Sequence, residues 1–515
     1  VTDTPGDEGA IFASLVQGEG LRDETLASLR EEDDSAILEV NGELIAVEQA
    51  EFTVTNTNDS GEGSLRAAIE QANNTEGADT INFDSNLSGE TINVTSNFLT
   101  ITDDLTITGL GAEELTLDAA ESNRLFAIAA EGLEVSMEGL TLTGGTASTS
   151  GGAIVNRGNL TLTEAVITDS SSDSDGGAIF SDGELTLTGS TVSDNDGSGI
   201  FNDREGTLTL TNSTVSGNGG GGIFNDIEGT LTLTNSTVSE NSGVGINNKP
   251  LGTLTLTNSI VSENSGGFRG GGIFNSNRTR VTLTNSTVSG NSASKGGGIY
   301  MTAGARVTLT NSTVFGNSAS NGGGIFNGSG ILTLTNSTLS GNFGNFANNS
   351  SGGAVYNGEN GNTTLNNSTL FGNTATNGGG LYNYGEATLA NSIIAGSVDS
   401  NDLANLFGEL ETVGVNLVED GSFSGDNILN EAPQLTSLQD NGGVTLTHSP
   451  QEGSPVLDAG DNEAIPTDEE TGEPIAFDQR GEDRVSGEAV DLGAVEVQGV
   501  DEVGPSNQPP QAAND

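Results

Sequence analysis

One short phrase repeats through most of this chain, and a fixed repeat constrains a fold more strongly than any single motif. The phrase LTLTNSTVSGN begins at Leu208, and weaker copies begin upstream at Leu133, Leu160 and Leu185. The asparagine of each NST triplet, or its equivalent, recurs after 23, 23, 27, 26, 25, 31 and 24 residues. Units this short cannot bury an apolar face alone, so they predict a solenoid of stacked units. The asparagines are Asn212, Asn235, Asn258, Asn285, Asn311, Asn336, Asn367 and Asn391.

Each unit predicts two or three short β-strands. In LTLTNSTV, apolar and polar residues alternate, which is the period of a strand with one buried face. GGGIF predicts a second strand entered through glycines, and Gly- and Asn-rich turns separate the strands. Within the repeats, proline occurs only at Pro250, as expected where strands are paired on both sides. The predicted fold class is therefore all-β, a parallel β-helix.

Stacking of equivalent units predicts columns of like residues. An isoleucine column would form a buried aliphatic ladder. In an asparagine column each amide offers two donors and an acceptor, so it can satisfy turn backbone groups and its own neighbours. The isoleucines are Ile179, Ile200, Ile223, Ile246, Ile273, Ile299 and Ile325, and the asparagines are Asn195, Asn218, Asn241, Asn264, Asn291, Asn317 and Asn342.

An aromatic column directly follows the isoleucine column. Strict strand alternation would point the rings outward, where they could stack on a sugar or a partner. A corner of the helix would instead let both neighbouring residues face inward, and we favour this buried corner. The column comprises Phe201, Phe224, Phe274, Tyr300, Phe326, Tyr356 and Tyr382.

The repeat also resembles a known family. GGAI at 151–154 and 176–179, with VSGN and LFGN where that family has Phe-x-x-Asn, resembles the polymorphic outer-membrane protein repeat. The resemblance implies a right-handed parallel β-helix (β-solenoid) on a bacterial surface, and hence an exported, extracellular or cell-surface location. We divide the chain into an acidic N-terminal leader (1–50), an N-terminal cap with the first rungs (51–130), the repeats (131–400), a C-terminal cap or anchor-type region (401–500) and a linker (501–515).

The first two segments hold a predicted hairpin and a predicted cap. Residues 36–49 alternate around an Asn-Gly turn, which favours a hairpin. Further on, Ser64 is a plausible N-cap for a short amphipathic helix. Its apolar face would hold Leu65, Ala68, Ile69 and Ala72. Such a helix would cover the open apolar end of a solenoid, and the stretch resembles a leader seen ahead of bacterial β-helix repeats.

Residues 454–496 resemble the choice-of-anchor region that follows β-helices and precedes varied surface-sorting signals. The ending GPSNQPPQAAND predicts an interdomain linker, so we expect this chain to be part of a longer surface protein. The resemblance carries over to Asp458, Gly460, Asp478, Arg480, Gly481, Arg484, Asp491, Gly493 and Glu496, with no catalytic role implied for any of them.

Charge and composition narrow the partners. The formal net charge is −58, which argues against nucleic acid and anionic membranes as partners. The acidity lies at the two ends, because residues 208–345 carry four acidic and six basic residues. There is no cysteine, and no apolar run reaches the ~18–20 residues of a transmembrane helix. An uncovered solenoid end could still pair with another copy, so end-to-end self-association stays open.

Catalysis would need clustered groups on one face. A hydrolase needs paired carboxylates, and a lyase needs a cation, carboxylates to hold it and a base. The acidic residues of 208–345 are scattered, and His448, the only histidine, lies outside the repeats, where we expect a structural or surface role. Arg280 and Arg306 precede equivalent strands and should stack, either as a solvated face or as a contact for an acidic sugar.

We therefore expect a non-enzymatic adhesin, spacer or structural coat or fibre subunit of the cell surface or extracellular matrix. The alternative is a β-helix that binds or cleaves a surface polysaccharide. This alternative has the same fold, but its outer face must carry side chains that bind or cleave a polysaccharide.

Calcium is the one cofactor considered. DNDGSGIFNDRE matches a twelve-residue calcium loop at Asp194, Asp196, Gly199 and Glu205, but the repeat alone explains much of that stretch. Two stacked acidic turns could instead share one ion. The candidate ligands are Asp173, Asp175, Asp194 and Asp196.

Overall fold

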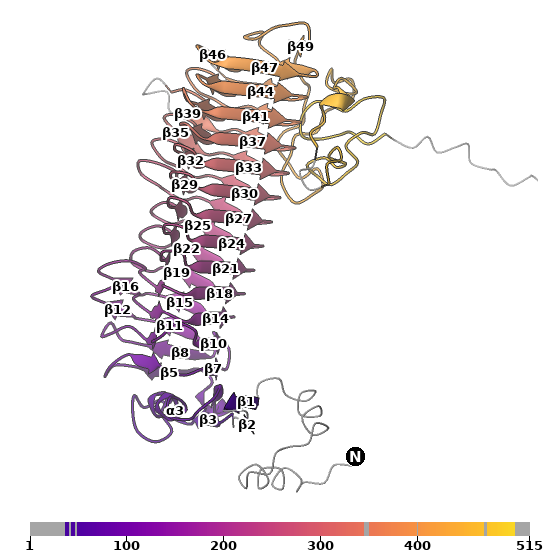
Figure 1. The fold of residues 1–515 in the computed structure, drawn as a ribbon. Coiled ribbons are helices and arrows are strands. Elements are labelled where there is room, and N and C mark those ends of the chain that lie inside the picture. The colour runs from indigo at the N-terminus through magenta and orange to yellow at the C-terminus, as the bar shows by residue number, and fades with distance from the viewer. Residues whose placement is uncertain are drawn as a thin grey trace, which may run out of the picture.

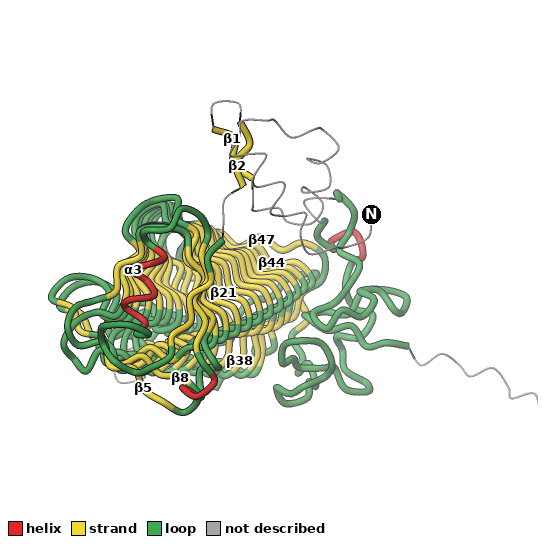
Figure 2. Tube along the Cα trace, turned by 90° about the horizontal axis from the view of Figure 1, so that it is seen from below, coloured by secondary structure: helices red, strands yellow, loops and turns green. Residues whose placement is uncertain are grey.

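The computed structural model describes residues 37–40, 43–46, 49–344, 350–398, 400–467 and 471–499. The chain forms a right-handed parallel β-helix, which confirms the predicted fold class. Three parallel sheets of 15, 15 and 13 strands run along the axis, and each turn of the chain adds one strand to each sheet over most of the length (Figure 1). Viewed along the axis, the strands enclose a single core (Figure 2).

The first sheet contains the LTLT-type strands. Its order is β3 (Glu51–Val54), β4 (Asp79–Phe83), β7 (Leu105–Thr108), β10 (Glu134–Glu138), β14 (Asn159–Thr163), β18 (Glu184–Thr188), β21 (Thr207–Thr211), β24 (Thr230–Thr234), β27 (Thr253–Thr257), β30 (Arg280–Thr284), β33 (Arg306–Thr310), β37 (Ile331–Thr335), β41 (Asn362–Asn366), β44 (Glu386–Ala390) and β47 (Glu409–Val413).

The second sheet contains the STV-type strands that follow each NST asparagine. Its order is β5 (Glu90–Asn93), β8 (Leu115–Asp118), β11 (Thr141–Thr143), β15 (Val166–Thr168), β19 (Thr191–Ser193), β22 (Thr214–Ser216), β25 (Thr237–Ser239), β28 (Ile260–Ser262), β31 (Thr287–Ser289), β34 (Thr313–Phe315), β38 (Thr338–Ser340), β42 (Thr369–Phe371), β45 (Ile393–Ala395), β48 (Asn416–Val418) and β49 (Ile428–Leu429).

The third sheet contains the GIF-type strands. Its order is β6 (Leu99–Ile101), β9 (Phe126–Ile128), β13 (Ile154–Asn156), β17 (Ile179–Ser181), β20 (Ile200–Asn202), β23 (Ile223–Asn225), β26 (Ile246–Asn248), β29 (Ile273–Asn275), β32 (Ile299–Met301), β36 (Ile325–Asn327), β40 (Val355–Asn357), β43 (Leu381–Asn383) and β46 (Leu403–Asn405). Two short pairs lie beside it, β12 (Thr146–Ala147) with β16 (Ser171–Ser172) and β35 (Ser318–Ala319) with β39 (Phe343–Gly344).

The NST asparagines make the corner between the first and second sheets. All eight adopt left-handed backbone conformations, with φ between 44° and 51°. Asparagine tolerates this region better than most residues with a side chain, which explains why the unit keeps it at that place. The serine of the same triplet is buried, and its hydroxyl accepts a hydrogen bond from the serine N–H of the preceding rung, as between Ser213 N and Ser236 Oγ at 3.1 Å.

The predicted interior columns are confirmed. The isoleucine column is fully buried, and the predicted asparagine column is buried with it. In that column each side chain donates to the next, as from Asn218 Nδ2 to Asn241 Oδ1 at 2.9 Å. The same acceptor also receives the backbone N–H of Asn218. A second buried asparagine ladder, not predicted, runs through the third sheet, as from Asn202 to Asn225 at 2.7 Å.

The N-terminal end is closed by the predicted helix α3 (Leu65–Ala72). The Ser64 hydroxyl accepts the N–H of Ala67, and the buried face holds the four residues expected from the sequence. The helix packs against β3, β4 and β6 across the end of the core (Figure 2). The strands β1 (Ile37–Val40) and β2 (Glu43–Ala46) pair antiparallel, as the hairpin prediction requires, while the rest of residues 1–48 lies outside the described part.

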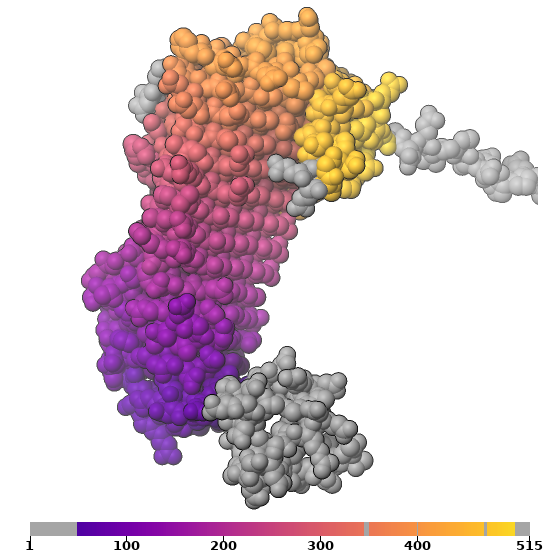
Figure 3. Space-filling view, viewed as in Figure 1, coloured from indigo at the N-terminus to yellow at the C-terminus, as the bar shows by residue number. Residues whose placement is uncertain are grey.

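The C-terminal region is irregular, as expected, but it does not cover the C-terminal end of the β-helix. Solenoid strands continue to Leu429, past the predicted boundary at 400. Residues 431–499, with one short 3₁₀ turn, η3 (Asn462–Ala464), fold back along the side of the last rungs (Figure 3). We call residues 431–499 the flank region. It lies on the side because outward hydroxyls of the second sheet, at Thr313 and Thr338, bond to it there.

No helix in the described part of the chain is both long and apolar enough to cross a membrane.

Candidate functional site

The aromatic column lies on the outer face of the third sheet and outside the core, so the prediction of an inward-facing corner is wrong. Phe201, Tyr300 and Phe326 are nevertheless only 6–8% exposed. In the chain, the residue before each ring is an aliphatic residue, usually isoleucine, that points into the core, and the residue after it also points inward. Because side chains alternate along a strand, the ring between them points outward. The rings stack on one another along the axis, with centroids 4.5 Å apart for Phe201 and Phe224 and 4.6 Å apart for Phe326 and Tyr356. Because neighbouring rings cover each other's faces, mainly ring edges meet solvent.

Cations accompany this aromatic stack. Asn247 interrupts it, and Lys249 Nζ occupies the gap, 4.7 Å from the ring centre of Phe224 and 5.7 Å from that of Phe274. Arg269 and Lys295 each lie 5.3 Å from a ring centre further along. These distances are in the range of cation–π interactions. Much of the ring surface that could bind a ligand is therefore already in contact with the protein's own cations and rings.

The four predicted calcium ligands are all exposed. Asp194 is a left-handed corner residue, and Asp196 pairs through the backbone with Ser171 on the preceding rung. Asp173 and Asp175 follow on that rung's loop. The described residues hold no group of three or more acidic or histidine side chains arranged to hold a metal ion. Calcium binding at these turns stays a prediction.

A groove that the sequence did not reveal crosses the turns between the third and first sheets. The turns at 157–158 and 182–183 have two residues each, whereas their neighbours at 129–133 and 203–206 are longer. The short turns leave a depression of about 700 Å³ between the longer ones. Its charged lining is Glu131, Arg157, Asp182, Glu184, Arg204 and Glu205.

The groove mixes carboxylates with guanidinium groups. Arg204 lies 3.6 Å from Asp226, and burial raises the pKa of Asp203, with Asp182 and Asp226 adding to the effect. Burial lowers the pKa of Arg124, and nearby Arg157 lowers it further. Such a lining can donate and accept hydrogen bonds along a hydroxyl-rich ligand. The sequence signal for such a groove is a difference in length between neighbouring units, which the structure places in these turns.

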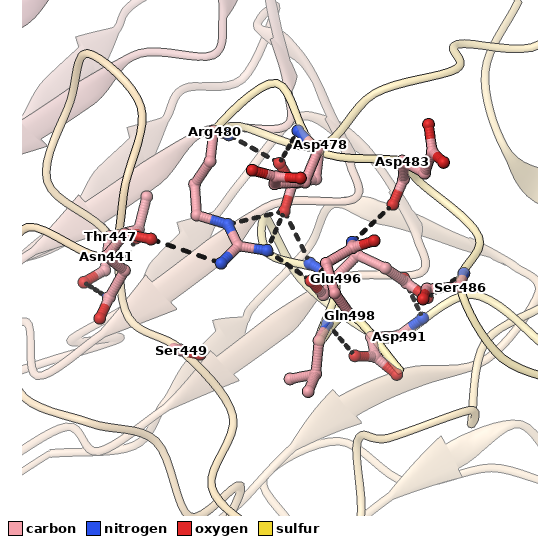
Figure 4. Close-up of polar contacts among 12 residues, drawn as sticks. Asn441, Thr447, Ser449, Asp478, Arg480, Asp483, Ser486, Asp491, Glu496 and Gln498 are labelled. Atoms are coloured by element: carbon pink, nitrogen blue, oxygen red, sulfur yellow. Dashed lines mark hydrogen bonds and ion pairs between the residues drawn. The ribbon is translucent and has the colours of Figure 1, made fainter. Parts of the chain in front are cut away.

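Four of the residues carried over from the choice-of-anchor resemblance, Asp478, Arg480, Asp491 and Glu496, lie together in one polar cluster of the flank region (Figure 4). Asp478 binds the Arg480 guanidinium at 2.8 Å and accepts the backbone N–H of Glu496. The Glu496 carboxylate accepts the N–H groups of Ser486 and Asp491 at 2.9 and 2.8 Å. The sequence named these residues but could not place them together.

Arg484 lies within the same cluster and is 1% exposed. Its Nη2 donates to the carbonyl oxygens of Asp491 and Gly493 at 2.8 and 2.7 Å. Burial raises the pKa of Glu496 to about 7, against the opposing effect of its two backbone donors. Two arginines and the carboxyl groups of Asp478, Asp491 and Glu496 thus lie together, and the cluster is best described as a structural core made of ionisable groups.

The side chain of His448 links the flank region to the β-helix. Nδ1 lies 2.7 Å from the carbonyl oxygen of Thr436, which can only accept, so Nδ1 carries the proton. Nε2 then accepts from the Ser340 hydroxyl at 2.8 Å. Burial lowers the pKa of His448, which favours this neutral form. The interpretation of the single histidine as structural agrees with these contacts. Arg280 and Arg306 are paired on adjacent rungs, as predicted, and both are exposed.

Comparison with known proteins identifies the fold. A family described as "Right handed beta helix region" matches residues 92–249. No curated protein matches the chain at a significant level. Among solved structures, the A-module of mannuronan C-5 epimerase AlgE4 from Azotobacter vinelandii is 13% identical, with a TM-score of 0.38, over 73% of this chain and 99% of that one.

Two further solved structures are similar at the same level. The PL6 family alginate lyase AlyGC is 14% identical, with a TM-score of 0.44, over 84% of this chain and 58% of that one. The Dettilon tailspike protein is 14% identical, with a TM-score of 0.33, over 70% and 68%. At these identities the likeness concerns the fold alone.

Proposed function

We propose that this chain is a non-enzymatic, exported bacterial surface or matrix protein whose β-helix acts as a rigid spacer in an adhesin, coat or fibre. The observation that carries the proposal is the continuity of the interior. Strands, isoleucines, serines and the asparagine column that begins at Asn195 continue from rung to rung, so bending at one rung would break bonds in all of them. At roughly 4.8 Å per strand, fifteen strands give a rod about 70 Å long.

The resemblance of the repeat to polymorphic outer-membrane proteins and of residues 454–496 to choice-of-anchor regions supports a surface location. The flank region adds a junction near one end of the rod, bonded through Thr313, Thr338 and Asn336. Buried hydrogen bonds at such a junction suit a module that transmits force between the rod and whatever follows it.

Deletion of one whole unit tests the spacer role. Removing residues 212–234 joins Thr211 to Asn235, which preserves the corner and the register because Thr211 pairs with Thr234. Cells displaying this shortened chain should adhere as cells displaying the full chain do. Removing only residues 212–223 breaks the register and should abolish both folding and adhesion. Loss of adhesion by a correctly folded one-unit deletion would instead identify a specific site in that unit.

The second candidate function is polysaccharide binding in the turn groove, favoured by the juxtaposition of Arg157 and Arg204 with carboxylates. Affinity electrophoresis against polyuronates and neutral glucans would detect it. Arg157→Ala with Arg204→Ala should remove retardation, whereas Arg278→Ala, on an exposed turn elsewhere, should not. Turnover of any polysaccharide that is lost with Asp182→Asn would replace the non-enzymatic proposal by an enzymatic one.

Calcium binding and end-to-end association are part of the same proposal. Calorimetry should detect calcium in the native chain and not in the variant carrying Asp173→Asn and Asp194→Asn. Light scattering should show an elongated monomer at low salt, since the acidic ends repel, with association favoured as salt screens them. An unchanged calcium titration in the double variant would remove the stacked-turn site.

A further inference from the structure

The outer face of the first sheet carries two unbroken columns of threonine. Each strand from β14 to β33 places leucine or valine inward and threonine outward, and the parallel register aligns equivalent threonines, such as Thr209, Thr232 and Thr255. All of these threonines are partly exposed. The columns are Thr161, Thr186, Thr209, Thr232, Thr255, Thr282 and Thr308, and Thr163, Thr188, Thr211, Thr234, Thr257, Thr284 and Thr310.

Strand propensity explains a threonine at any one of these positions, but it does not by itself explain two columns of threonine on seven consecutive strands. From β14 to β33 neither column holds an Asp, Glu, Lys or Arg, although Glu138 takes the second-column position on β10, one rung before. On these seven strands the charged residues stand at the bordering position, as Glu184, Arg280 and Arg306 do. In the middle of the sheet even that position is threonine, on β21, β24 and β27.

The array is regular in two directions. Neighbouring strands lie about 4.7–4.9 Å apart, and outward residues on one strand repeat every ~6.6–6.8 Å. The inward leucines Leu208 and Leu210 and their equivalents are fully buried, so the backbone beneath the array is held by the core. Threonine is β-branched and has few accessible rotamers, so its hydroxyl and methyl groups are held in place as well. Figure 1 shows these strands stacked in order from β14 to β33.

The hydroxyl groups of the array are also available. Within the described residues, none of the threonine hydroxyls of the two columns bonds to another protein group. The second column becomes covered where the flank region begins, because its next residue, Thr335, is only 7% exposed. The first column continues with Thr333, Thr364 and Thr388, all partly exposed. In the second column, a stretch exposed to solvent is therefore followed directly by a buried residue.

We propose that this threonine face binds ice. Both spacings of the array lie close to repeat distances between water oxygens in hexagonal ice. Hydroxyl groups at those spacings can take lattice positions, and the methyl groups between them favour ordered water over bulk water. Charged side chains would orient water around themselves and disturb such a lattice. Between β14 and β33 no charged side chain stands in either column, so this stretch of the face leaves such a lattice undisturbed.

A crystalline neutral polysaccharide is the other occupant with a regular flat surface. Proteins bind sugar faces largely through exposed aromatic rings. The long aromatic column of this chain is on a different sheet, and its ring faces are covered by neighbouring rings. Ice therefore fits the face better, and binding to cellulose or chitin becomes an outcome of the test.

The test uses the full chain, fluorescently labelled, in buffer around a slowly growing ice crystal. Thermal hysteresis is measured on the same samples. The native chain should enter the ice and depress its growth temperature. Thr232→Lys with Thr255→Lys, which places two charges at the centre of the array, should reduce both readouts to those of a non-binding protein. Thr214→Lys with Thr237→Lys makes the same change on adjacent rungs of the second sheet and should leave both unchanged.

Circular dichroism and thermal unfolding should be alike for the native chain and both double variants, because all four positions are outward. Exclusion of the native chain from ice would overturn the proposal, as would equal losses in the two variants. Sedimentation with crystalline cellulose or chitin, lost on Thr232→Lys with Thr255→Lys and without any effect on ice, would assign the face to polysaccharide and also overturn it.

Discussion

The solenoid and the flank region both bury many polar groups, but they satisfy them by opposite means. The solenoid interior uses neutral amides and hydroxyls, and each donates to its copy one rung away, as Asn218 does to Asn241. The flank region uses charges, with Arg484, Asp478 and Glu496 buried together. Repetition supplies a partner of the same kind at a fixed distance. A segment without repetition has no such partner and needs groups that bond strongly enough to fix an irregular backbone.

The largest effect should come from placing a charge where the solenoid has none. Ile246→Asp puts an unpaired carboxylate in a fully buried column and should cost about 4 kcal/mol or more in the free energy of unfolding. Ser242→Asp, four residues away on an exposed turn, should change the stability by less than about 0.5 kcal/mol. Thermal unfolding followed by circular dichroism compares the two, and equal shifts would refute the column assignment.

The converse change removes a charge where the flank region depends on it. Arg484→Met removes a fully buried cation that interacts electrostatically with Glu496, Asp478 and Asp491 and should destabilise the flank region by about 3–4 kcal/mol. Limited proteolysis should then cleave residues 431–499 while the solenoid stays intact. Arg278→Met, on an exposed turn, is the control. Unfolding of the solenoid together with the flank region would show that the two are one cooperative unit.

A smaller loss should follow from breaking one asparagine ladder. Asn241→Ala removes the acceptor of both the side chain and the backbone N–H of Asn218. We expect a loss of about 2–3 kcal/mol, because buried donors are left unsatisfied. Asn277→Ala, at an exposed turn, should be nearly neutral. A neutral Asn241→Ala in denaturant unfolding would mean that the ladder specifies register without adding stability.

A pH dependence should be confined to the flank region. The pKa of Glu496 is about 7 in the folded chain, above its ordinary 4.5, so the folded state retains the proton longer than the unfolded state. Stability from this group is therefore unaffected below about pH 4.5, falls between about 4.5 and 7, and stays reduced above. Glu496→Gln should remove that part of the decline.

Proteolysis of the flank region at pH 5 and pH 8 would measure this dependence. The native chain should lose more protection between the two values than Glu496→Gln does. The contribution of Glu496 is the difference in lost protection between the native chain and Glu496→Gln. The loss in the native chain alone does not give it, because the remaining acidic residues also repel one another more as the pH rises. An identical decline in both proteins would assign the pH dependence to that general repulsion.

Most of the solenoid could be predicted because its determinants are local. The alternation in LTLT and the return of the same residue each rung identify inward columns, and Ile246 and Asn241 lie where those patterns place them. The helix cap at Ser64 was predictable for the same reason. The aromatic column was predicted to face inward although the same alternation points it outward, since a corner had been expected where the structure has a strand.

The sequence alone thus determined the fold class, the buried columns and the capped end, because periodicity encodes which residues stack. The tertiary structure decided where the flank region lies, how its charged residues meet and where the turn groove forms. Thr338 and Gln479, which fasten the flank region, are 141 residues apart, and no local pattern joins them. The groove arises from a difference in turn length between adjacent rungs. Such features depend on contacts between segments that do not resemble each other, and the repeat carries no information about them.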